Sequence, residues 1–111
     1  MTVDFEMYSG DNREQPFAVF DSTGNAVDVS TANEITYRLS VGVGGETIFT
    51  KTMTGGDITV ATSTIIVIFV PADTAALAGR YAHEIEIVDG VGKKYTGLQG
   101  QMGIYEDIID D

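Results

Sequence analysis

Residues 63–88, STIIVIFVPADTAALAGRYAHEIEIV, decide the fold of this chain. The stretch opens with a run of apolar, mostly β-branched residues, passes through an alanine-rich segment, and ends in strict alternation of apolar and polar residues. The run predicts a central strand that is covered on both faces, and the alternation predicts a strand that is half-buried. The segment between them must therefore carry the chain from one strand to the next.

The first of these strands, expected over residues 63–70, is apolar on both sides. Its second apolar face consists of Ile66, Ile68 and Val70. Because each strand of a two-sheet sandwich has only one face in the core, something else must cover this second face. We expect a loop, the apolar pair Ile108 and Ile109 of the acidic C-terminal tail, or a partner subunit in that place. The candidate interface therefore comprises Ile66, Ile68, Val70, Ile108 and Ile109.

The segment after this strand predicts a short helical corner. Five of the seven residues 72–78 are alanine or leucine, which favour helix. Proline suits the first helical turn, an aspartate there favours the positive helix end, and a glycine suits the left-handed stop. We expect Leu77 to plug one end of the core. The residues assigned to this structural corner are Pro71, Asp73, Leu77, Gly79 and Tyr81.

Alternation elsewhere predicts more short strands, separated by glycine-rich turns. The expected strands are residues 2–8, 17–20 (opened by Pro16), 34–42, 46–53, 58–60, 63–70, 81–88 and 93–105, with an extended piece at 26–29. In the strand at 34–42, Ile35, Tyr37, Leu39 and Val41 are expected to point inward. Seven or eight such strands at intervals of about 8–12 residues are typical of a β-sandwich. No segment is long enough for a βαβ crossover helix, so we expect antiparallel pairing.

Composition limits the class of protein. The chain has 111 residues, which predicts one domain, residues 1–111, ending in a short acidic tail. Six Lys and Arg face 17 Asp and Glu, a net charge of −11 that should repel nucleic acid and anionic membranes. The sequence contains no cysteine, and its first residues predict no secretory signal.

The sequence offers no constellation of catalytic residues, so we expect no enzymatic activity and no cofactor. His83 is the only histidine, and on an inward strand face it is expected to be a core or interface residue. A zinc site would need three or four nitrogen or sulfur ligands. The glycines at 42–45 suggest a hairpin turn, because no Gly-Lys-Ser/Thr follows them.

Two binding alternatives stay open. A calcium ion could use loop oxygens of Asp21, Asn25, Asp28, Asp57, Asp73, Asp89, Glu106, Asp107, Asp110 and Asp111. Against this, the twelve-residue calcium loop is missing, and aspartates beside glycine turns commonly bind their own backbone. β-Sandwiches also bind carbohydrate, but the chain has no tryptophan and its five tyrosines fall largely within strands.

Three stretches, GNAVDVSTANEITYRL (24–39), GGDITV (55–60) and VPADTAALAGRYAHEIEIVDGVGK (70–93), resemble a family of small immunoglobulin-like domains of tailed bacteriophages. The resemblance extends from about residue 3 to 104. It rests mainly on the Pro-x-Asp-Thr-x-x-Leu-x-Gly-x-Tyr corner and the Asp-x-x-Gly turn that follows the next strand. His83 departs from the apolar or aromatic residue usual at that position.

The resemblance implies an immunoglobulin-like sandwich with a structural, non-enzymatic role in the virion. Similar domains begin baseplate upper and tail-fibre proteins. We therefore expect an interaction module made in the host cytoplasm and built into the tail, baseplate or fibre attachment region, with other virion proteins as partners. The alternatives are a capsid-surface decoration protein or, in another class, a calcium- or carbohydrate-binding module.

Overall fold

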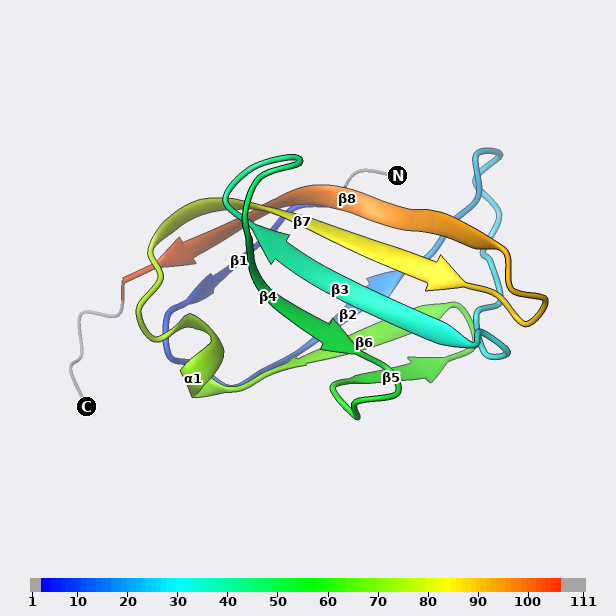
Figure 1. Ribbon diagram of the computed structural model, residues 1–111, viewed down its shortest axis with the longest axis horizontal. Helices are drawn as coiled ribbons and strands as arrows, with labels where there is room; N and C mark the ends of the chain where they lie inside the picture. Colours follow the sequence, from blue (N-terminus) through cyan, green and yellow to red (C-terminus); the bar gives the residue numbers. More distant parts are fainter. Residues whose placement is uncertain (1–2, 107–111) are drawn as a thin grey trace.

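Two β-sheets pack face to face in a body that measures 45 × 25 × 23 Å. The computed structural model describes residues 3–106. Its elements are β1 (Phe5–Tyr8), β2 (Arg13–Ala18), β3 (Glu34–Ser40), β4 (Thr47–Thr52), β5 (Ile58–Ala61), β6 (Thr64–Phe69), α1 (Pro71–Thr74), β7 (Gly79–Val88) and β8 (Lys94–Tyr105). Figure 1 shows the two layers, with α1 at one end of the molecule and the β3–β4 hairpin rising above the larger sheet.

The strand order confirms the predicted all-β sandwich with one short helix. One sheet runs β1-β8-β7-β3-β4 and the other β2-β6-β5. The arrangement is immunoglobulin-like. β3, β7 and β8 correspond to strands C, F and G of one immunoglobulin sheet, and β2, β5 and β6 correspond to strands B, D and E of the other. β6 is the central strand of the smaller sheet, as its apolar run predicted.

The prediction of purely antiparallel pairing is wrong for one pair of strands. β1 pairs with β8 in parallel, with Phe5 opposite Met102 and Tyr8 opposite Tyr105. A parallel pair requires a long connection, and here almost the whole domain lies between the two strands. Without a crossover helix, two strands that are close in sequence cannot pair in parallel. This reasoning does not apply to β1 and β8, which lie near opposite ends of the chain.

The core lies between the sheets and follows the predicted alternation. Ile35, Tyr37 and Leu39 of β3 are fully buried, and Ile85 and Ile87 of β7 pack beside them. An aromatic group fills the centre, with ring centroids 5.5–6.4 Å apart; its members are Phe5, Phe17, Tyr37, Phe49, Phe69 and His83. Rings at these separations add stabilisation beyond the area they bury.

Three details differ from the predicted elements. Val41 is 61% exposed, because β3 ends at Ser40 and the chain turns into its hairpin. Pro16 lies within β2 rather than at its start, which an edge strand tolerates. The extended piece at 26–29 is not a strand: it forms an isolated bridge between Phe20 and Ala26, and the N–H groups of Val27 and Val29 donate to carbonyls of Val19 and Thr62.

Candidate interaction surface and the α1 corner

The α1 corner is a short helix, as predicted, but its bounds differ. The helix covers Pro71–Thr74 instead of 72–78, and Pro71 occupies the first helical turn as expected. The backbone N–H of Leu77 donates to the carbonyl of Thr74 at 2.9 Å, which closes one further turn. Gly79 already pairs with Ile104 as the first residue of β7, so too few residues remain for a longer helix.

Asp73 does more in this corner than interact with the helix end. Its carboxylate Oδ2 accepts the N–H of Val70 at 2.8 Å and lies 2.7 Å from the Nζ of Lys51. Lys51 is 7% exposed and comes from β4, so the ion pair connects α1, which follows β6 of the smaller sheet, to the larger sheet. Sequence reasoning missed Lys51. The signal was available, because a lysine two residues after Phe49 falls at an inward position of a strand and needs an anionic partner.

The predicted plug Leu77 is only partly buried against the core, whereas Thr74 is completely buried. The hydroxyl oxygen of Thr74 accepts the backbone N–H of Gly10 at 2.9 Å. Thr74 therefore closes this end of the sandwich and connects the corner to the β1–β2 turn. Leu77 does pack against the core as predicted, but the fully buried residue of the corner is Thr74, which lies within the helix, whereas Leu77 lies beyond its end.

Tyr81 and Gly79 fix the exit from the corner. The Tyr81 hydroxyl donates to the carbonyl of Ala78 at 2.9 Å and accepts its N–H at 3.2 Å. This resembles the tyrosine corner of immunoglobulin domains, in which a tyrosine near a strand start binds backbone a few residues upstream. Gly79 has φ of +114°, a positive value that favours glycine, but it begins a strand and does not cap the helix.

His83 is a buried core residue. Its Nε2 donates to the carbonyl of Val3 at 2.5 Å, and its Nδ1 accepts the hydroxyl of Tyr37 at 2.9 Å. Burial lowers the pKa of His83, which favours the neutral imidazole that this pair of bonds requires. Both ring nitrogens are thus engaged within the core, and His83 is only 2% exposed.

The loop aspartates bind their own turns. Asp21 Oδ1 accepts the N–H groups of Thr23 and Asn25, and Asp89 Oδ1 accepts those of Val91 and Lys93. The hydroxyl of Thr23 also donates to Asp21 Oδ1, at 2.7 Å, and this bond first, with the backbone N–H bonds after it, lowers the pKa of Asp21. Between residues 3 and 106, no three His, Cys, Asp or Glu side chains are grouped to hold a metal ion.

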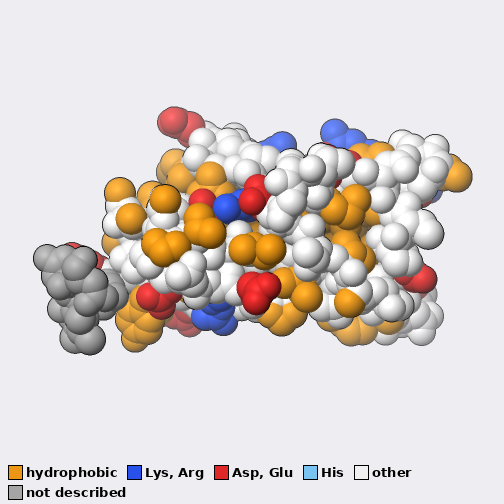
Figure 2. Space-filling view, turned by 90° about the horizontal axis from the view of Figure 1, so that it is seen from below, with side chains coloured by type: hydrophobic (Ala, Val, Ile, Leu, Met, Phe, Trp, Pro, Cys, Tyr) orange, Lys and Arg blue, Asp and Glu red, His pale blue; other side chains and the backbone are white. Residues whose placement is uncertain are grey.

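The outer face of the smaller sheet carries the candidate interface. Ile66 and Ile68 are half-buried there, and Val70, which follows the strand, is 42% exposed. Ile108 and Ile109 lie outside the described residues. The cross-strand neighbours on this face are Glu14, Pro16, Ala18, Thr59 and Ala61. Figure 2 shows this side of the molecule, where hydrophobic side chains lie among uncharged groups and a few acidic and basic side chains. Within residues 3–106, no strand or helix lies over it.

No protein-family model matches the chain, and no curated protein is significantly similar to it. Among the helices of the described part of the chain, none has the length and apolar character needed to cross a membrane.

Proposed function

We propose that this chain is a structural interaction protein of a bacteriophage virion, without enzymatic activity, in the tail, baseplate or fibre attachment region. The observation that carries the proposal is the outer face of β6, where Ile66 and Ile68 stand half-buried on a sheet that no described element covers. The phage location comes from the sequence resemblance around the α1 corner. Its partners are other virion proteins in a multi-copy assembly.

The chemistry of this face suits a protein partner. Ile66 lies between Pro16 and Thr59 on the neighbouring strands, and all three side chains are uncharged. Glu14 stands opposite Ile68, so this uncharged strip is bordered by a carboxylate, while the chain as a whole carries a net charge of −11. Interface cores are depleted of charged residues in the same way, and a stable interface buries about 800 Å² per partner. A small sheet face would form the centre of such an interface, with surrounding loops as its rim.

The α1 corner supports a scaffold role. Its buried ion pair, its Thr74 contact and its Tyr81 bonds all join elements of the fold to one another. They hold the sandwich rigid at one end and leave its sheet faces for contact. A module that connects other proteins in an assembly requires this kind of rigidity, because ordering a loose surface would cost binding energy.

The test is incorporation into particles. Purified phage should contain the chain by quantitative mass spectrometry, and immunogold labelling should place it on the tail; labelling on the head would support the capsid decoration alternative. The variant Ile66→Thr/Ile68→Thr keeps β-propensity and removes apolar area. It should fold cooperatively but be lost from particles, whereas Val91→Thr, at a 90% exposed turn position, should be incorporated normally.

Each result has a distinct meaning. Absence of the wild-type chain from purified particles would overturn the virion role. Normal incorporation of the isoleucine variant would leave that role intact and overturn the assignment of the β6 face. Loss of the fold in the same variant would show that both faces of β6 are internal, and the interface would then have to lie elsewhere.

A further inference from the structure

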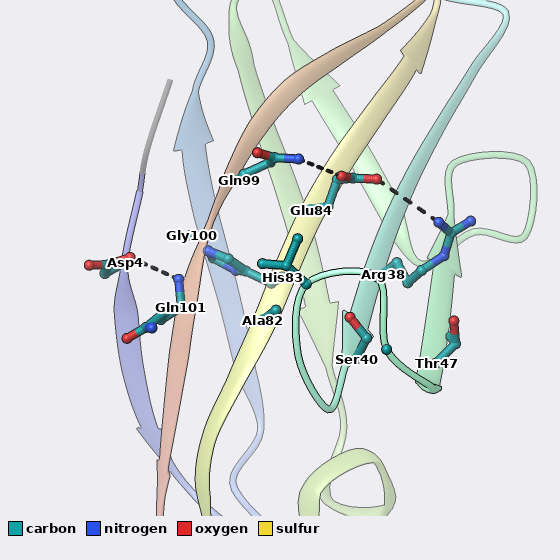
Figure 3. A pocket seen from close by; sticks show the side chains of 13 residues that line it. Asp4, Arg38, Ser40, Thr47, Ala82, His83, Glu84, Gln99, Gly100 and Gln101 are labelled. Atoms are coloured by element: carbon teal, nitrogen blue, oxygen red, sulfur yellow. Dashed lines mark hydrogen bonds and ion pairs between the residues drawn. The ribbon is translucent and has the colours of Figure 1, made fainter.

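A groove of about 720 Å³ lies on the opposite side of the molecule from the β6 face. Its floor is the outer face of the larger sheet, and one wall is the β3–β4 hairpin, which arches over the strands in Figure 3. The floor carries Arg38, Ser40, Ala82, Glu84, Gln99 and Gln101, from three adjacent strands. Its volume is in the range of small-molecule sites.

Three polar side chains on this floor contact one another. Gln99 Nε2 donates to Glu84 Oε2 at 2.8 Å, and Arg38 Nη1 lies 3.9 Å from the other oxygen of Glu84. These three side chains therefore form a row across β8, β7 and β3, as the dashed lines in Figure 3 show. Guanidinium, carboxylate and amide together offer both donors and acceptors along one line.

This mixture distinguishes between ligand classes. An anion such as a phosphate would be repelled by Glu84 and Asp4, which also lines the groove. A metal cation would be repelled by the positive charge of Arg38. An extended peptide would seek a strand edge or an apolar pocket, whereas this site is the polar face of a sheet. The hydroxyl groups of a neutral sugar donate and accept hydrogen bonds at once, so they match alternating donors and acceptors.

Apolar surface for the C–H face of a sugar is provided by the hairpin and by two tyrosines. Val43, at the hairpin and 92% exposed, lines the groove. Tyr105 lies four residues beyond Gln101 in β8, a distance of about 13 Å along the strand. Tyr105 is 50% exposed and Tyr8 is 56% exposed, and their ring centroids are 6.0 Å apart. The Tyr105 hydroxyl already donates to Glu6, so this pair would offer a sugar chiefly the apolar faces of its rings.

We propose that this groove binds a neutral oligosaccharide, held at Arg38, Glu84 and Gln99 and extending along β8 toward Tyr105. The site is independent of the proposed virion role, because it uses the other sheet. A protein could then dock through the β6 face while the groove stays open to a glycan.

The experiment is an NMR titration of the ¹⁵N-labelled chain with cellohexaose, maltohexaose and chitohexaose, each tested separately. At least one should cause saturable shifts of the Gln99 side-chain amide and of backbone amides in β7, β8 and the hairpin. Gln99→Ala and Arg38→Ala should each weaken that binding about tenfold, the loss expected for one or two hydrogen bonds. The matched control Gln15→Ala, on the edge strand of the smaller sheet, should bind as the wild type does.

Three results would overturn the proposal. The first is the absence of saturable shifts with all three sugars. The second is saturable shifts confined to residues outside the groove and the Tyr8–Tyr105 pair. The third is equal binding by Gln99→Ala, Arg38→Ala and the wild type. The wild-type titration decides the question even if a variant fails to fold.

Discussion

The ion pair between Lys51 and Asp73 gives the sharpest test of how the corner is held. The two side chains are 8% and 15% exposed, and Nζ lies 2.7 Å from Oδ2. Lys51→Met keeps the apolar stem but leaves the Asp73 carboxylate buried with only the Val70 N–H to bind. Breaking a buried pair in this way costs about 3–5 kcal/mol. Because Asp73 keeps that one donor, we expect the lower end, about 3 kcal/mol, or a fall in Tm of about 12 °C.

The assay is urea denaturation followed by circular dichroism, with a matched control on the surface. Lys94 pairs with Glu86 at 3.3 Å, but the lysine side chain is 65% exposed. Lys94→Met should therefore cost no more than about 0.5 kcal/mol. The double variant Lys51→Met/Asp73→Asn should be about 2 kcal/mol more stable than the sum of its single changes predicts. Equal stability of Lys51→Met and Lys94→Met would refute the argument.

Three further predictions concern the core, pH and calcium. Leu77→Ala should lower the free energy of unfolding by about 1 kcal/mol, because Leu77 is only partly buried. Thr74→Val should lower it by about 1–3 kcal/mol, because the Gly10 N–H loses its acceptor. Thermal melts that reverse this order would contradict the corner geometry. Because the pKa of His83 is lowered in the fold, the stability that its neutral form contributes is fully present above about pH 6.5. Below that pH the free energy of unfolding should fall by up to about 1.4 kcal/mol per pH unit. A flat stability profile between about pH 5 and 7 would contradict this prediction. Millimolar calcium should leave the Tm unchanged, since a ligand at 100 times its Kd would add about 2.7 kcal/mol and be obvious in a melt.

Local sequence patterns predicted most of the residues that face the core; Val41, Lys51 and Thr74 are exceptions. In β3 and β7, alternate apolar residues became the buried face, and His83 joined them because its position in the alternation points inward. The run in β6 predicted a central strand, and the glycines after β3 predicted a hairpin. These features depend on the two-residue period of a strand, which any short segment contains in full.

Long-range contacts could not be predicted in the same way. The parallel pairing of β1 with β8 joins the two ends of the chain, and the approach of Lys51 to Asp73 joins β4 to α1. Periodicity shows that a side chain points inward, but it does not show which partner it will meet. That choice depends on strand order and register across the whole domain.

One of the two candidate sites could be predicted from the sequence, and the other could not. Ile66 and Ile68 were visible in the sequence, because a second apolar face on one strand is a local pattern. The groove was not, since Arg38, Glu84 and Gln99 each occupy an ordinary outward position in a different strand. The sequence by itself determined the strands, their inward faces and the corner between β6 and β7. Only the tertiary structure decided which outward side chains stand side by side, because sheet pairing brings together residues that are far apart along the chain.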